Sequence, residues 1–242
     1  MANDTMIEPR KGKSSPNIGP VAMLAATCND LIALRKLFDF ADADAHKLFN
    51  SRLYANPHRH RGLSLTGPMT GAPYAVMILE TLVAWGARRF LFLGWCGAIS
   101  KLVKTGDLII PTAAVIGEGT SPYYQPDAEQ SRPSPEMVTN IKALLSESDL
   151  VFHEGPIWTT DAVYRETRQQ IQRLQRQGIL AVEMETSAVF TVAKYRSVKA
   201  AAVLVVSDEL SGKDWKPGFK QKRFQQERMR ACRMASKLCL TL

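Results

Sequence analysis

The sequence contains no apolar run of about 18 residues, so none of it is long enough for a transmembrane helix. Residues 1–18 are polar and lack the apolar core of a signal peptide, and we expect them to form a flexible arm. The four cysteines share no zinc-binding or Cys-x-x-Cys spacing. We therefore predict a cytoplasmic protein with reduced thiols and without a metal site or disulfide framework.

A recognisable nucleic-acid-binding motif is also lacking, although the net charge is +8. Much of the positive charge lies in residues 56–62 and 213–237. In the second stretch Phe224, Ala231, Met234 and Leu238 recur at roughly helical spacing, which is typical of an amphipathic surface helix. We predict no nucleic-acid partner, and we note that a basic balance suits an anionic small substrate.

Apolar, strand-like runs alternate with longer amphipathic stretches along the chain. Strands are predicted at 20–26, 63–67, 89–98, 107–116, 152–160 and 199–210, and helices at 30–39, 72–85, 135–146, 162–177, 186–195 and 219–240. Several predicted strands are apolar on both faces, as a sheet covered by helices on both sides requires. The pattern predicts one α/β domain over 19–242, a three-layer α/β/α fold with a central mixed sheet.

Unusual chemistry recurs where these strands end. The segments are GWCGA (94–98), GEGTSPYY (117–124), TTDAVY (159–164), VEMET (182–186) and VSDEL (206–210). Ligands of such sheets bind beyond the carboxyl ends of strands, so these ends are the candidate site. Residues two apart lie on different faces of a helix but on the same face of a strand. We therefore expect Glu183 and Glu185 to straddle a strand end and a helix start. Their simplest reading is acids placed favourably in a first helical turn.

Four blocks together resemble one known family, the nucleoside phosphorylase superfamily that includes hexameric purine nucleoside phosphorylase, uridine phosphorylase and methylthioadenosine nucleosidase. The blocks are at 65–82 (LTGPMTGAPYAVMILETL), 92–124, 182–193 (VEMETSAVFTVA) and 205–210 (VVSDEL). The resemblance implies a nucleoside phosphorylase-like fold, cleavage of the N-glycosidic bond of a nucleoside by phosphorolysis, and a homo-oligomer, dimer or hexamer. It implies no cofactor, with inorganic phosphate as a possible co-substrate.

The resemblance also implies roles for the acids. Glu185 is expected to accept hydrogen bonds from the ribose hydroxyls, Met184 to pack on the sugar, and Glu183 to support them. Asp208 is expected to donate a proton or hydrogen bond to a purine ring nitrogen, with Ser207 orienting it. The alternative for Asp208 is a helix cap. Pyrimidine-specific relatives carry a Gln-x-Arg pair that this chain lacks at the expected place, so a purine-type base is favoured.

The chain departs from the family at the phosphate. Family members carry an Arg and a Ser or Thr where this sequence has Phe92 and Trp95, and neither side chain supplies the donors and positive charge that a dianion needs. One possibility is that an arginine from the same chain or from a neighbouring subunit enters the site and binds the phosphate. The candidates are Arg35, Arg52, Arg59 and Arg61. The other is hydrolysis, with Asp30 activating water, although Asp30 can equally be an acid favoured by the helix dipole. A nucleoside-binding protein without turnover is a third hypothesis.

The remaining expected substrate contacts come from the strand-end segments, although Trp95 can equally be a core residue. They are Gly94, Trp95, Cys96, Gly97, Thr120, Ser121, Trp158 and Tyr164.

Overall fold

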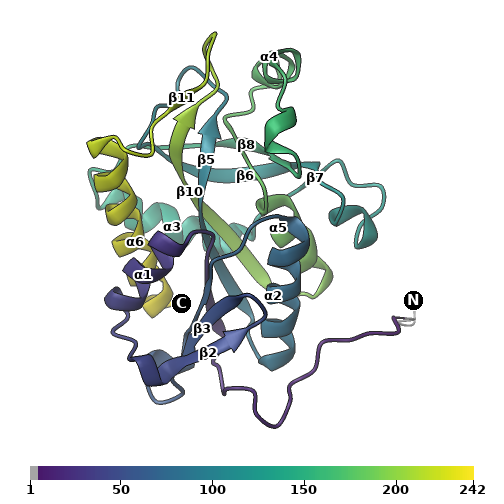
Figure 1. Cartoon of the computed structure of the whole chain (residues 1–242), viewed down its shortest axis with the longest axis vertical. Helices are drawn as coiled ribbons and strands as arrows, with labels where there is room; N and C mark the ends of the chain where they lie inside the picture. Colours follow the sequence, from purple (N-terminus) through teal and green to yellow (C-terminus); the bar gives the residue numbers. More distant parts are fainter. Residues whose placement is uncertain (1–4) are drawn as a thin grey trace.

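The computed structural model describes residues 5–242 (Figure 1). Its strands are β1 (Val21–Ala25), β2 (Ala45–Leu48), β3 (Ser51–Ala55), β4 (Ser64–Gly67), β5 (Arg89–Ala98), β6 (Leu108–Gly117), β7 (Gln130–Ser131), β8 (Phe152–Thr160), β9 (Ala181–Glu183), β10 (Lys199–Glu209) and β11 (Lys216–Pro217). Its α-helices are α1 (Cys28–Leu37), α2 (Ala72–Trp85), α3 (Pro135–Ser146), α4 (Arg168–Arg176), α5 (Thr186–Tyr195) and α6 (Lys222–Thr241).

The helices form layers on the two faces of one mixed sheet. Helices α1, α3 and α6 pack together on one face, and α2 and α5 cover the other (Figure 1). Strand β5 shows why both layers are needed, because Leu91 and Leu93 point into the first core while Phe90 and Phe92 point into the second. The three-layer α/β/α fold predicted from the sequence is therefore confirmed.

Strand β5 lacks a paired neighbour along part of one edge. Strands β5, β10, β6, β8 and β9 pair in a closed circuit, while β1, β4, β3 and β2 continue the sheet outward. One edge of β5 pairs with β1 from Arg89 to Leu93 and then with β9 at Gly97 and Ala98. Between these two partners, residues 94–96 have no paired strand on that edge within the described chain. The predicted GWCGA segment thus lies where the sheet parts.

Two differences from the predicted elements have local causes. The β2–β3 hairpin was not predicted, because its strands have four and five residues and carry exposed polar side chains such as Lys47 and Arg52. Helix α4 begins at Arg168 and not at 162, because Thr167 caps it by accepting a hydrogen bond from Gln170 N–H.

Of the predicted N-terminal arm, residues 1–4 lie outside the described residues, and residues 5–18 form no helix or strand. The arm and its flexibility remain predictions. Across residues 5–242 no helix combines the length and apolar character needed to cross a bilayer.

Candidate active site

Glu183 and Glu185 straddle the end of β9 and the start of α5, as expected. One oxygen of Glu183 accepts hydrogen bonds from the backbone N–H groups of Glu185 (2.8 Å) and Thr186 (2.7 Å) and from the Thr186 hydroxyl (2.7 Å). Its other oxygen accepts from the hydroxyl of Thr159 on β8. Burial raises the pKa of Glu183, against the lowering effect of these donors. Glu183 therefore caps α5 and fixes the backbone that carries Glu185.

Glu185 is equally buried but less fully bonded. Its carboxylate accepts a hydrogen bond from the N–H of Gly71, the residue before α2. Gly71 has a φ of 85°, a value that favours glycine. The approach of the Gly71 N–H to the Glu185 carboxylate therefore depends on glycine at this position. Burial, with the nearby Glu183 carboxylate, raises the pKa of Glu185 to about 8. Such a carboxylate gains most from further hydrogen-bond donors, such as sugar hydroxyls.

Asp208 lies on β10 and is held from two sides. Its Oδ1 accepts from the Ser207 hydroxyl and its Oδ2 from the indole N–H of Trp215, both at 2.7 Å. A Cβ on Gly97 would lie 3.2 Å from Oδ2 and 2.4 Å from Leu210 Cδ1, so the glycine makes room for the acid. Ser207 thus orients Asp208, as the sequence suggested, while the Trp215 donor was not predicted.

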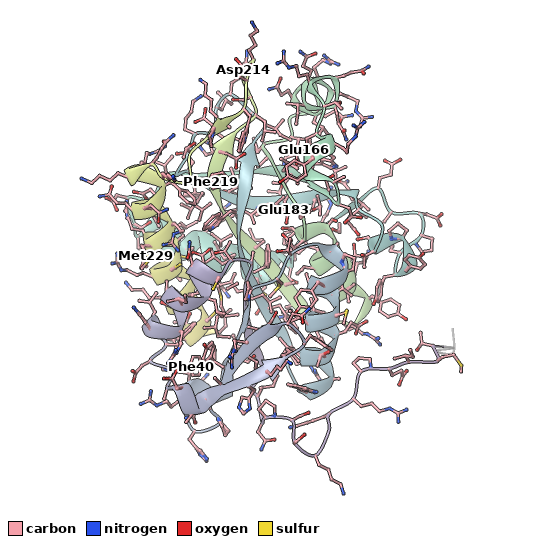
Figure 2. The ribbon with its side chains drawn as sticks, viewed as in Figure 1. Phe40, Glu166, Glu183, Asp214, Phe219 and Met229 are labelled. Carbon is pink, nitrogen blue, oxygen red and sulfur yellow. The ribbon has the colours of Figure 1, made fainter. Side chains whose placement is uncertain are left out.

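Strand register brings the acids to one place. Gly97 on β5 is opposite Val182 of β9 on one side and Asp208 of β10 on the other. The end of β9, which carries Glu183 and is followed by Glu185, and the end of β10 with Asp208 therefore flank the same glycine. Figure 2 shows Glu183 well away from Phe40, which lies near the β2–β3 hairpin. Cys96 is buried near Glu183 and Asp208. Its burial, together with these two carboxylates, raises the pKa of its thiol well above the usual value.

Trp95 and Asp30 meet on the other side of β5. The indole N–H of Trp95 donates to Asp30 Oδ2 at 2.7 Å, and Arg228 of α6 forms an ion pair with Oδ1 at 2.7 Å. The Thr27 hydroxyl also donates to Asp30, which is 0% exposed. The Trp95 ring packs edge-on against Phe224, with centroids 5.0 Å apart. Both residues thus belong to the core between β5, α1 and α6.

The segment after β6 is tied to the start of α5 by an acid that the sequence analysis did not single out. One oxygen of Glu118 accepts from the Ser187 hydroxyl (2.9 Å), and the other accepts from the backbone N–H groups of Thr120 and Ser121. Ser121 itself is fully buried, and its hydroxyl has no hydrogen-bond partner within residues 5–242. Glu118 could have been predicted as a site residue from the sequence, because it belongs to the GEGTSPYY segment at a strand end.

Several expected contacts lie elsewhere. Trp158 is buried under α4 with Ile171 and Val182, and Tyr164 is 98% exposed. Gly94 leaves room for the Phe92 ring, which would lie 2.9 Å from an added Cβ.

The structure brings Glu183, Glu185 and Asp208 together around Gly97, whereas Tyr164 lies on the exposed surface. Met184 lies between the two glutamates at this junction, partly exposed.

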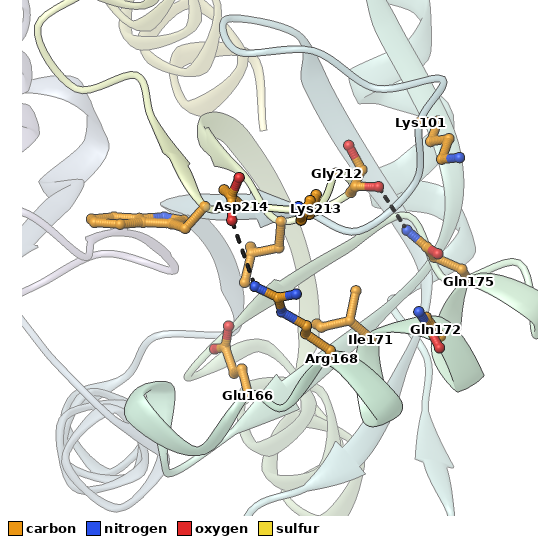
Figure 3. A pocket seen from close by; sticks show the side chains of 12 residues that line it. Lys101, Glu166, Arg168, Ile171, Gln172, Gln175, Gly212, Lys213 and Asp214 are labelled. Carbon is orange, nitrogen blue, oxygen red and sulfur yellow. Dashed lines mark hydrogen bonds and ion pairs between the residues drawn. The ribbon is translucent and has the colours of Figure 1, made fainter.

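A cavity of about 550 Å³ lies between α4 and the segment that joins β10 to β11 (Figure 3). Trp215, the donor to Asp208, forms part of its wall. Arg168 and Asp214 form an ion pair across it at 3.5 Å. Glu166, from the turn before α4, projects into it. This volume is within the range of small-ligand sites, of about 300–1,000 Å³.

Comparisons with known proteins identify the family of the chain. The family model described as "Phosphorylase superfamily" matches residues 40–241. A guanosine phosphorylase from Halorubrum lacusprofundi is 30% identical over 148 residues, 61% of each chain. A DeoD-type purine nucleoside phosphorylase from Bacillus cytotoxicus is 29% identical over 159 residues, 65% of this chain and 68% of the other. The match to the guanosine phosphorylase thus spans less than two thirds of that protein.

Two solved structures show the same fold. A uridine phosphorylase from Vibrio fischeri superposes with a TM-score of 0.77 at 23% identity, over 92% of this chain and 90% of the other. An AMP nucleosidase from Bacteroides thetaiotaomicron gives 0.71 at 22% identity, over 93% and 88%. The family model, matching most of the chain, shows that this protein belongs to the phosphorylase superfamily.

Proposed function

We propose that this protein cleaves the N-glycosidic bond of a purine-type nucleoside by phosphorolysis, with inorganic phosphate as co-substrate. The observation that carries the proposal is that the ends of β9 and β10 flank Gly97. The acids for which the family resemblance implies contacts to the ribose and to the base therefore come from strand ends on either side of one residue. The similarity to a guanosine phosphorylase and a purine nucleoside phosphorylase supports a purine base.

In this proposal Glu185 holds the ribose. Ribose hydroxyls donate to its carboxylate, which Gly71 and the Glu183 cap keep in place. These donors lower its pKa from about 8 and keep it charged, so that it stabilises the positive charge developing on the sugar as the bond breaks. Met184, which is partly exposed, packs on the sugar.

Asp208 addresses the base. Ser207 and Trp215 fix its carboxyl group, and a proton passed from it to a ring nitrogen lets the base leave neutral.

The two side chains at the expected phosphate position supply no free donor. Phe92 is fully buried, and the Trp95 N–H is used by Asp30. Of the candidate arginines, Arg35 pairs with Asp42 and Arg59 with Asp39. Arg52, on β3, and Arg61 are exposed and have no ion-pair partner among the described residues. We propose that Arg52 or Arg61 of a second copy in a homo-oligomer supplies charge to the phosphate.

Hydrolysis is the second candidate, and the same two residues, Phe92 and Trp95, favour it. Asp30 is not proposed as its base, because the Asp30 carboxylate is buried in an ion pair with Arg228 and a Trp95 hydrogen bond. We propose a structural role for Asp30 instead.

Product identity across a phosphate titration separates the two reactions. Incubation of the purified protein with inosine, guanosine and adenosine should release base in proportion to phosphate and yield ribose 1-phosphate, with Glu185→Gln as the inactive control. Free ribose formed at the same rate without phosphate would establish hydrolysis. Tight binding without products across a broad nucleoside panel would refute enzymatic activity and identify a binding protein.

A further inference from the structure

Glu166 is an acid without a partner in a cavity. It follows the short turn Val163–Arg165, is half-buried, and projects into the cavity between α4 and the segment that joins β10 to β11 (Figure 3). Within residues 5–242 it has no hydrogen-bond or ion-pair partner, while neighbouring Arg168 is paired with Asp214. A partly desolvated carboxyl group without donors gains by binding a ligand that supplies them.

Two residues of the cavity wall also border the candidate active site. Trp215 donates its indole N–H to Asp208 Oδ2 at 2.7 Å. Leu210 lies against Gly97, because its Cδ1 would be 2.4 Å from a Cβ added there. Together with Ile171 of α4, these two residues give the cavity an apolar wall. The cavity therefore adjoins the place where the ends of β9 and β10 flank Gly97, and its wall suits a flat ring.

We propose that this cavity binds the base of the nucleoside, and that Glu166 selects the base by accepting hydrogen bonds from a ring N–H and an adjacent exocyclic amino group. Guanine has such an edge, so the substrate class is a 2-amino-6-oxopurine nucleoside. The inference rests on the proposed nucleoside cleavage and adds to it a residue that determines specificity. Glu166 takes no part in the proton transfer proposed for Asp208.

The chemistry of a carboxylate distinguishes the common purines. A carboxylate offers two acceptor oxygens and no donor. Guanine presents two parallel donors to it, the ring N1–H and the 2-amino group, whereas hypoxanthine presents N1–H alone. Adenine presents an N1 without a proton, and the lone pair of that nitrogen would face the carboxylate. Because each hydrogen bond to a charged group changes affinity by about tenfold or more, guanine should bind best and adenine worst.

The surroundings of Glu166 leave its carboxyl group available to a base. Burial, with the Asp208 carboxylate, raises the pKa of Glu166 to about 7, so donors from a base would stabilise its charged form. Two lysines line the same cavity, Lys101 after β5 and Lys213 before β11. Both are exposed, and neither forms an ion pair with Glu166 within the described chain.

The test compares kcat/KM for guanosine, inosine and adenosine in the full-length protein at about pH 8, where Glu166 is mostly charged. The wild type should prefer guanosine to inosine, and inosine to adenosine, by about tenfold or more at each step. Glu166→Gln supplies one acceptor and one donor group, which match the 6-amino group and N1 of adenine. It should therefore lower the ratio of guanosine to adenosine by about 10²-fold.

Two further variants control for the loss of the side chain. Glu166→Asp keeps the carboxyl group and should keep guanosine as the best substrate. Glu209→Gln should leave the ratios unchanged, because Glu209 adjoins Asp208 in sequence but bonds to Thr105.

The outcomes separate this inference from the proposed function. An equal fall on all three substrates in Glu166→Gln would overturn the inference, because that result marks a packing role, and would leave nucleoside cleavage intact. Equal wild-type values for guanosine and adenosine would do the same. A wild type without turnover on any nucleoside would instead refute the proposed function. Equilibrium dialysis with the free bases guanine and adenine then tests Glu166 alone, and an unchanged guanine preference in Glu166→Gln would overturn its role.

Discussion

Asp30 and Asp208 both accept a hydrogen bond from an indole N–H, yet their surroundings differ. Trp95 donates to Asp30 and Trp215 donates to Asp208, each at 2.7 Å, and both rings lie near Phe219, at 6.2 and 6.3 Å between centroids. Asp30 is fully buried and has Arg228 as counter-ion. Asp208 is only partly buried and has no ion pair within the described chain.

The difference shows how burial divides acids between fold and function. A fully buried carboxylate that is paired with a cation, as Asp30 is with Arg228, has no charge left to offer a ligand. A partly exposed acid at a strand end that is held by neutral donors keeps its capacity to bind a ligand. The surroundings of the two carboxyl groups, more than their residue type, thus assign Asp30 to the core and Asp208 to the candidate site.

The largest expected effect separates the two acids by activity. Asp208→Asn should lower kcat/KM for purine nucleosides by about 10²- to 10⁴-fold, because a proton donor to the leaving base is lost. A nucleoside analogue with a good leaving group should be affected less, since it needs no protonation. Steady-state kinetics with both substrates check this, and equal losses would contradict the acid role.

The next effect concerns stability and belongs to Asp30. Arg228→Met should lower the free energy of unfolding by about 3–5 kcal/mol, because it leaves the Asp30 carboxylate buried without a cation. The double variant Asp30→Leu with Arg228→Met removes both charges and should recover much of this loss. Urea unfolding of both variants checks it. A double variant no more stable than the single one would show that the pair is not what matters at this site.

A pH dependence extends the comparison to Glu185, which is buried without a cation. Its pKa rises from 4.5 to about 8 on folding, so between these values the folded chain binds more protons than the unfolded chain. Its contribution to stability is therefore complete below about pH 4.5 and is lost as the pH rises through about 8.

Glu185→Gln should remove that loss. The Tm of the wild type should fall relative to the variant between about pH 5 and pH 9, by about 2–4 °C for each kcal/mol involved. Thermal unfolding of both proteins across this range checks it, and parallel Tm profiles would contradict the raised pKa.

The smallest effect compares the two indoles directly. Trp95→Phe should cost about 1.5–3 kcal/mol of stability, because a hydrogen bond to a buried charged group is lost. Trp215 is 59% exposed, so Trp215→Phe should change stability little and instead lower kcat/KM for purine nucleosides several-fold. Unfolding and kinetic measurements on both variants check this. A variant pair in which Trp215→Phe is the more destabilising would reverse our assignment.

The sequence was sufficient for the layers of the fold and for the strand-to-helix junction at Glu183. Residues 89–98 and 152–160 were predicted as strands with their observed ends, because apolar runs bounded by turn residues carry that information locally. The Glu183 junction was also predictable, since residues two apart have different neighbours in a strand and a helix.

What the sequence could not give depends on contacts between distant residues. Nothing local to Asp30 reveals Arg228, which is 198 residues away, so a water-activating role was as reasonable as a structural one. Glu166 and Trp215 are likewise 49 residues apart, and only the packing of α4 against the segment before β11 brings both to one cavity. Such tertiary placement has no periodicity or motif that would announce it.

The Asp30–Arg228 pair also has a consequence for how the chain is made. Asp30 is translated early and lies in α1, whereas its counter-ion lies in α6, the last helix of the chain. Until α6 has left the ribosome, the pocket for Asp30 has no cation, and the face of the sheet that α6 covers is exposed. The core between β5, α1 and α6 is therefore completed only after α6 has been synthesised, and truncation within α6 should leave a chain dependent on chaperones.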